Sequence, residues 1–180
     1  VLKGGVDTIF GGAGENSVQF SDDSRTIGIN VNLTKNQTLG STDTYRVIND
    51  GFGNVKYLDG VQNIVGTSFN DTIFGNSESN KLIGGAGDDT LRGGTGSNYL
   101  DGGTHTDLAT GGGDWAWFDD IAGYGVNISV SSGLMSNAQI NTNTNILNSI
   151  EHIKGTGQAD IIATDDVHNT ILSGSGNDTI

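Results

Sequence analysis

The chain has 180 residues, of which 30 are glycine and none is proline or cysteine, and its formal net charge at pH 7 is −13. The absence of cysteine excludes a disulfide scaffold. The acidic balance argues against binding to nucleic acid or to an anionic membrane surface, and it favours cations as partners. No apolar run approaches the ~20 residues of a membrane-spanning helix, so we expect no membrane insertion.

A period of nine residues begins near the N-terminus. Its sixth position holds Asp7 and then Asn16, and its eighth position holds Ile9 and then Val18. We therefore expect a first repeat block at about residues 2–19. A fixed period is typical of repeat architectures, in which one structural unit stacks on the next.

The period is interrupted by a first insertion at about residues 20–65. Aliphatic residues alternate with polar ones from Ile27 to Leu33, which predicts a half-buried strand. Residues 36–44 are polar and rich in Asn and Thr, which favours a loop. Residues 55–65 are expected to form a strand that returns the chain to the repeat.

The central repeat block, at about residues 66–118, contains five consecutive nonapeptides that each begin with glycine. Their sixth positions are acids or amides: Asp71, Asn80, Asp89, Asn98 and Asp107. Their eighth positions are aliphatic: Ile73, Leu82, Leu91, Leu100 and Ala109.

Each position of the nonapeptide has a physical role. Glycine permits positive φ, so the first half of the repeat can form a tight turn whose carbonyl groups converge. A carboxylate at the end of this turn adds charge to a set of main-chain oxygens, which is the ligand set that Ca²⁺ prefers. The last three residues suit a short strand whose central aliphatic side chain points inward.

These nonapeptides resemble the G-G-x-G-x-D-x-U-x repeats of the RTX (repeats-in-toxin) family. Residues 84–92 match every specified position of the pattern. The resemblance implies an all-β fold, a right-handed parallel β-roll with two nonapeptides per coil, and calcium bound between the turns of successive coils.

Two nonapeptides per coil would place alternate sixth positions on the same edge of the roll. We therefore predict calcium between Asp71 and Asp89, between Asp89 and Asp107, and between Asp160 and Asp178. The glycines of the adjoining turns are the predicted carbonyl ligands: Gly84, Gly85, Gly87, Gly102, Gly174 and Gly176. Asn80, Asn98 and Ala116 are expected to line the other edge, which should bind metal weakly or not at all. An asparagine there could instead cap its own turn.

A second insertion, at about residues 119–154, resembles the first. Residues 125–130 parallel residues 28–33, and residues 150–156 parallel residues 61–67. We expect strands around Val126–Val130 and Ile146–Ile153, and a polar loop at 136–145. A last repeat block, at about residues 155–180, has Asp160, Asn169 and Asp178 at the sixth position. We treat residues 1–180 as one β-roll domain cut from a longer protein.

Calcium is predicted to act as a folding switch. One buried aliphatic residue per nonapeptide contributes ~2–3 kcal/mol, whereas ordering nine residues costs roughly 13 kcal/mol. Clustered carboxylates and glycine-rich turns widen this gap. A cation that binds only the folded turns adds its binding energy to folding.

Other candidate sites are weaker. His105, His152 and His168 are scattered, without an HExxH motif or cysteine partners, so we expect no zinc site. Adjacent acids such as Asp119 and Asp120 suggest cation ligands or solvated charge more than glycosidase carboxylates. Trp115 and Trp117 could stack on a sugar, but they more naturally seal the end of a narrow core.

We interpret the chain as a non-enzymatic, calcium-binding structural module of a secreted or cell-surface bacterial protein of adhesin, surface-layer or filament type. In the alternative, it is the calcium-dependent folding and export region of a secreted RTX enzyme or toxin. Both interpretations place the chain outside the cell, and RTX proteins resemble cargo of type I secretion. Neighbouring copies of the module and a cell-surface glycan are the further partners considered.

Overall fold

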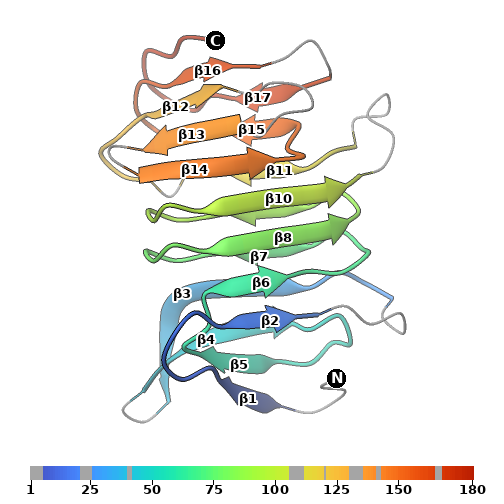
Figure 1. Ribbon diagram of the computed structural model, residues 1–180. Coiled ribbons are helices and arrows are strands. Elements are labelled where there is room, and N and C mark those ends of the chain that lie inside the picture. Colours follow the sequence, from blue (N-terminus) through green and yellow to red (C-terminus); the bar gives the residue numbers. More distant parts are fainter. Residues whose placement is uncertain are drawn as a thin grey trace.

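The computed structural model describes residues 6–20, 26–39, 42–105, 112–119, 121–129, 136–140, 143–164 and 168–180. Within these ranges all regular secondary structure is β-strand and no helix occurs, as the sequence predicts. The strands form two sheets, here called sheet A and sheet B, whose strands are stacked like rungs from β1 at one end to β16 and β17 at the other (Figure 1).

In the part of the chain that is described, sheet A has nine strands and sheet B has eight. Sheet A contains, in spatial order, β1 (Asp7–Phe10), β5 (Lys56–Asp59), β4 (Thr42–Asn49), β3 (Asn30–Leu39), β7 (Thr72–Phe74), β9 (Thr90–Arg92), β11 (Trp115–Trp117), β15 (His152–Lys154) and β17 (Thr170–Leu172). Sheet B contains β16 (Ile161–Ala163), β12 (Val126–Ser129), β13 (Ser136–Ile140), β14 (Asn143–Asn148), β10 (Tyr99–Thr104), β8 (Lys81–Ala86), β6 (Asn63–Val65) and β2 (Ser17–Gln19).

Through the central block the chain alternates between the two sheets, one nonapeptide to each. Strand β7 pairs in parallel with β9, with Ile73 beside Leu91, and β8 pairs in parallel with β10, with Leu82 beside Leu100. Paired residues are therefore separated by two nonapeptides, which together make one coil. This is the predicted parallel β-roll.

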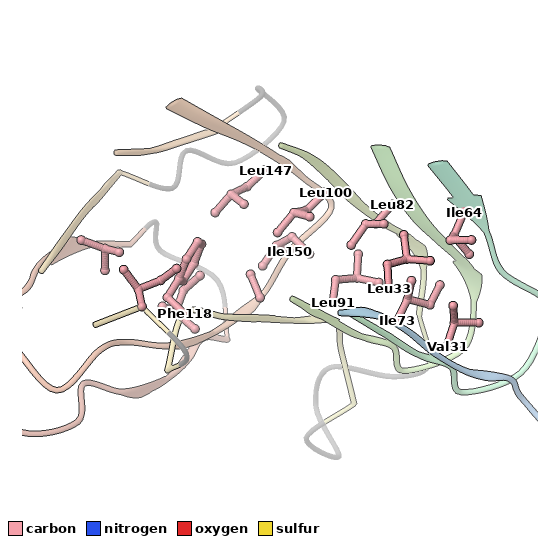
Figure 2. Close-up of a cluster of buried hydrophobic side chains, with 14 of the residues drawn as sticks. Val31, Leu33, Ile64, Ile73, Leu82, Leu91, Leu100, Phe118, Leu147 and Ile150 are labelled. Atoms are coloured by element: carbon pink, nitrogen blue, oxygen red, sulfur yellow. The ribbon is translucent and has the colours of Figure 1, made fainter. Parts of the chain in front are cut away.

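The core is a double row of aliphatic side chains, one row from each sheet. Ile73 and Leu91 of sheet A and Ile64, Leu82 and Leu100 of sheet B are 0% exposed. Figure 2 shows the row of sheet B facing Val31, Ile73 and Leu91 of sheet A. Successive strand residues point to opposite faces, so only the middle residue of a three-residue strand points inward. The eighth position therefore carries most of the burial energy of its repeat, about 1.5–3 kcal/mol per side chain.

The two insertions extend the sheets and do not lie across them. The first adds β3 and β4 to sheet A as an antiparallel pair, and the second adds β12, β13 and β14 to sheet B in antiparallel order. Both join the roll by a parallel contact: Val31 pairs with Ile73, and Ile128 pairs with Ile162. The sequence likeness of the two insertions thus corresponds to a shared way of joining the roll.

The loops expected at 36–44 and 136–145 are wrong, because these residues belong largely to strands β3, β4, β13 and β14. Their Asn- and Thr-rich sequence lacks the alternation that marks a half-buried strand. Antiparallel pairing needs only backbone groups, and threonine favours strands, so a polar strand forms without that pattern.

The nine-residue register breaks after Gly102. The period would place Ala109 beside Leu91, but Leu91 is paired with Ala116, which is 0% exposed. Ala116 therefore occupies an eighth position in sheet A, and its predicted place beside Asn80 and Asn98 is wrong. Residues 106–111, which include Asp107 and Ala109, lie outside the described residues.

Trp115 and Trp117 flank Ala116 and are half-buried on the outer side of β11. The expectation that they seal the end of the core is wrong, since sheet A continues beyond β11 into β15. The ring of Trp117 lies 6.2 Å from that of Phe74, and the Lys154 ammonium is 4.3 Å from the Trp117 centroid.

Candidate metal centre

Four carboxylates form a continuous series where the chain enters sheet A. The main-chain N–H of Ile29 donates to Asp71, that of Asp71 to Asp89, that of Asp89 to Asp114, and that of Asp114 to Glu151, at 2.7, 2.7, 2.7 and 2.8 Å. We call this series the acidic ladder. None of the four acids is more than 9% exposed, so they share one buried edge of the roll.

Amides occupy the opposite edge, where the chain enters sheet B. The N–H of Asn80 donates to Asn98 Oδ1 at 2.9 Å, and the N–H of Asn98 donates to Asn145 Oδ1 at 3.1 Å. We call this series the amide ladder. It makes the same backbone contacts as the acidic ladder without charge, so the two edges of the central block differ in their electrostatics.

Two of the carboxylates are satisfied by the residue after the first glycine of their own turn. In the turn that ends at Asp71, Thr67 donates its N–H to Oδ2 at 2.6 Å and its hydroxyl to Oδ1 at 2.9 Å. In the turn that ends at Asp160, Thr156 donates to the same two atoms at 2.8 Å each. Both carboxylates are thereby capped by protein donors.

Asp89 has no such cap. The equivalent of Thr67 in its turn is Gly85, whose φ is +125°. Asp89 Oδ2 is buried and, among the described residues, has no hydrogen-bond partner. It lies against the first glycine of the repeat: a Cβ on Gly84 would stand 2.1 Å from this oxygen. The glycine is required here by close approach, because any side chain would displace the carboxylate.

The electrostatics of this carboxylate are unfavourable without a cation. Burial raises the pKa of Asp89 to about 8; the hydrogen bond from the Asp71 N–H opposes this shift, and the charges of Asp71, Asp114 and Asp88 add to it. Burial likewise raises the pKa of Asp114 to about 7, against the hydrogen bond from the Asp89 N–H and with the charge of Glu151. A divalent cation would compensate the buried negative charge that burial and the neighbouring acids disfavour.

The acids of the last repeat block lie on the other edge of the roll. The N–H of Asp160 donates to Asp178 Oδ1 at 3.0 Å, and that of Val126 donates to Asp160 Oδ1 at 2.8 Å. Asp160 precedes β16 of sheet B, so this pair continues the edge of the amide ladder. Gly174 and Gly176 of the adjoining turn have φ of +97° and +126°.

The structure brings together most of the predicted site residues. The predicted glycines of the central block lie in stacked turns, since the N–H of Ala86 donates to Thr67 O at 3.0 Å and that of Gly87 to Thr104 O at 2.8 Å. Gly102 lies against Asp114 Oδ2. The acid that follows Asp89 in the acidic ladder is this Asp114, whereas Asp107 lies outside the described residues.

Sequence reasoning missed Asp114 and Glu151. Each stands two residues before a buried residue of a three-residue strand, Ala116 in β11 and Ile153 in β15. Asp71 stands in the same relation to Ile73. An acid two places before an aliphatic residue is therefore the signal that would have found both, without reference to the nine-residue period.

The residues present fit Ca²⁺. They offer buried carboxylate oxygens beside turns built of main-chain carbonyls, and Asp89 Oδ2 and Asp114 Oδ2 have no hydrogen-bond donor among the described residues. Ca²⁺ takes six to eight such oxygens in adaptable geometry. Bound calcium would supply positive charge to the buried acids and hold adjacent turns together. The chain's own residues set the spacing of the turns and exclude water from the carboxylates.

The comparison with protein families agrees with this geometry. The family model of the RTX calcium-binding nonapeptide repeat matches residues 3–22, 58–91, 65–100, 83–114 and 148–180. These ranges cover more than half of the chain, which therefore belongs to the RTX calcium-binding repeat family. It is a calcium-binding module of the kind that secreted bacterial proteins carry. No curated protein sequence matches the chain.

No helix in the described part of the chain has the length and apolar character needed to span a membrane.

Proposed function

We propose that this chain is a non-catalytic structural module that folds when it binds calcium. The observation that carries the proposal is Asp89 Oδ2, a buried carboxylate oxygen in a ladder of four acids that has no hydrogen-bond partner among the described residues. Such a group is unfavourable in the folded protein until a cation reaches it.

The energetic argument follows from what each state offers to calcium. The folded turns hold carboxylates and carbonyls at fixed positions, whereas the unfolded chain holds separated acids in water. Calcium binds the folded state preferentially, so its binding energy stabilises the fold. This makes folding a response to calcium concentration.

We assign the calcium sites to the acidic turns. Asp89 is the principal ligand, with carbonyls of Gly84, Gly85 and Gly87 and of the stacked turn at Gly102. Asp71 bounds this site from the preceding coil. The second site lies between Asp160 and Asp178, with carbonyls of Gly174 and Gly176. The amide ladder is proposed to remain free of metal because it repeats the same contacts without charge.

The proposed setting is the cell surface, where the module serves as a spacer of an adhesin, surface-layer or filament protein. Its support is the continuity of both sheets through both insertions, which makes a single extended stack of strands. The same unit, a repeat block followed by an insertion, occurs twice in 180 residues. Extended arrays are built by such repetition, with each unit contacting its neighbours.

The alternative is the folding and export region of a secreted RTX enzyme or toxin. The calcium-dependent turns suit that role equally well. The two functions differ in what adjoins residues 1–180 in the encoding gene. Further copies of the unit support the spacer, and a catalytic domain on the N-terminal side supports the alternative.

Far-UV circular dichroism during a calcium titration tests the folding switch. We expect a transition from coil to β-structure with calcium, reversal with EDTA, and no transition with magnesium at the same concentration. A β spectrum that persists after exhaustive chelation would show that packing alone holds the roll. A single transition in calorimetry with calcium would support one cooperative domain across residues 1–180; two separated transitions would contradict it.

A further inference from the structure

The break in the nine-residue register brings three different metal-ligating side chains together. His105 is the fourth residue of its nonapeptide, as Gly87 is the fourth residue of the nonapeptide that contains Asp89. The connection from His105 to Asp114 is longer than the one from Gly87 to Asp89. Its Nδ1 lies 3.7 Å from Asp114 Oδ2 and 3.4 Å from Glu151 Oε2. One ligand atom from each of the three residues lies within 4.8 Å of the other two.

Two of these atoms are buried and unsatisfied. Asp114 is 0% exposed, and neither its Oδ2 nor the Nδ1 of His105 has a hydrogen-bond partner among the described residues. Asp114 Oδ2 is aimed into the cluster and packs against Gly102, where a Cβ would stand 2.4 Å away. A buried oxygen of this kind requires either a proton or a cation.

An ion pair with protonated His105 does not account for the arrangement. An imidazolium donates its Nδ1–H to the acid that it neutralises, yet Nδ1 makes no hydrogen bond to either oxygen. The ligand atoms of the three residues instead lie within 4.8 Å of one another without a hydrogen bond from His105 Nδ1. The N–H of Asp114 donates to Glu151 Oε2 at 2.8 Å. This hydrogen bond fixes the orientation of the Glu151 carboxylate, as hydrogen bonds to metal ligands do in known metal sites.

We propose that His105, Asp114 and Glu151 form a site for one divalent transition-metal ion, with Zn²⁺ as the fitting ion, separate from the calcium sites. One imidazole and two carboxylates are a zinc-type ligand set, whereas calcium takes oxygen ligands only. Tetrahedral zinc with bonds of about 2.0–2.1 Å separates its ligand atoms by roughly 3.3 Å. The His105–Glu151 separation of 3.4 Å is close to that value.

The expectation that no zinc site is present rested on the absence of a short zinc motif, and these three residues are widely separated in the chain. The fold joins them: His105 and Asp114 bound the long connection between β10 and β11, and Glu151 precedes β15, the next strand of sheet A. The ion would tie the end of β10 and the start of β11 to the end of the second insertion, where the nine-residue period is interrupted.

Isothermal titration of Zn²⁺ into the calcium-saturated protein tests the proposal, after circular dichroism has verified the fold. We expect one zinc ion per chain that excess calcium does not displace. Co²⁺ in place of zinc should give visible absorption bands of a low-symmetry, four-coordinate site. These readouts are independent of the calcium sites, so a failure to bind zinc leaves the proposed calcium function untouched.

Three variants locate the site. His105→Ala should weaken zinc binding by more than about 100-fold, since loss of even an outer-shell partner costs about 10–100-fold. Glu151→Gln, which keeps the shape of the side chain, should also weaken it and alter the cobalt spectrum. His168→Ala removes an exposed histidine elsewhere and should change nothing. Absence of zinc binding, or equal binding by the His105 and His168 variants, would overturn the proposal.

Discussion

Replacing Asp89 by asparagine should have opposite effects with and without calcium. The raised pKa of about 8 means that, in the metal-free folded protein, this carboxyl holds a proton that the unfolded chain releases at a pKa of about 3.9. At pH 7 the difference spans roughly three pH units, which corresponds to ~4 kcal/mol of lost stability at ~1.36 kcal/mol per unit. Asparagine carries no such cost, and its amide oxygen can accept the Asp71 N–H as Asn98 accepts that of Asn80.

We therefore expect Asp89→Asn to stabilise the metal-free protein at pH 7 by about 2–4 kcal/mol, since neighbouring acids share part of the cost. In calcium the same variant should need a higher ion concentration to fold, because a charged ligand is lost. Because the folded pKa lies above the unfolded pKa, the stability of the metal-free wild type should fall as the pH rises from about 4 to about 8. At pH 5 the advantage of the variant should shrink to about 1.5 kcal/mol.

The assay is circular dichroism at pH 5 and pH 7, which gives the free energy of unfolding from urea titrations in calcium and the folded fraction without urea in EDTA. Asp88→Asn is the matched control, because Asp88 is adjacent but partly exposed. Its charge contributes less to the raised pKa of Asp89 than burial or the charges of Asp71 and Asp114 do, so the variant should change stability by much less than Asp89→Asn. If Asp89→Asn is less stable than the wild type in EDTA at pH 7, the buried charge is not the liability that makes folding depend on calcium.

Three further changes test the packing. Gly84→Ala should lower the free energy of unfolding by about 1–3 kcal/mol, because the added Cβ would stand 2.1 Å from Asp89 Oδ2. Gly157→Ala is the control: a Cβ there has no neighbour within 4 Å, so thermal melts of this variant should be near those of the wild type. Leu82→Ala should cost about 2–5 kcal/mol in urea unfolding, since Leu82 is 0% exposed; a loss below about 1 kcal/mol would mean that the roll relaxes to fill the space. Lys56→Met should cost about 3–5 kcal/mol at pH 7, because the Lys56 side chain is 1% exposed and its Nζ lies 3.3 Å from Oδ2 of the buried Asp50. Retained stability in urea unfolding would show that the ion pair is dispensable.

Much of the central block could be predicted because its period is strict. The aliphatic residue at every eighth position, such as Ile73 or Leu100, is the one side chain of its strand that can reach the core, and the glycines that precede it favour a turn. Family, parallel β-roll and calcium are accordingly confirmed. The two insertions also make equivalent hydrogen bonds: the N–H of Ile29 donates to Asp71 Oδ1, and the N–H of Val126 donates to Asp160 Oδ1.

The remainder depended on contacts between distant residues. The nine-residue period does not show that Leu91 pairs with Ala116, because the connection between them does not follow that period. The polar strands of the insertions have no alternation to detect. Asp71 and Asp89 also differ in how their turns satisfy them. Thr67 donates its N–H and its hydroxyl to Asp71, whereas Asp89 Oδ2 has no hydrogen-bond partner among the described residues.

The two ladders have a consequence for the protein as a polyelectrolyte. Stacked coils are separated by about 4.8 Å, so a single column of acids along the whole roll would accumulate strong self-repulsion. Here one edge is acidic from Asp71 to Glu151 while the other carries amides from Asn80 to Asn145, and beyond the second insertion the acids Asp160 and Asp178 continue the amide edge. The negative charge is thus divided into two short columns on opposite sides. This division limits the repulsion that accumulates along either edge of the roll, and cations bound at the acidic turns would lower it further.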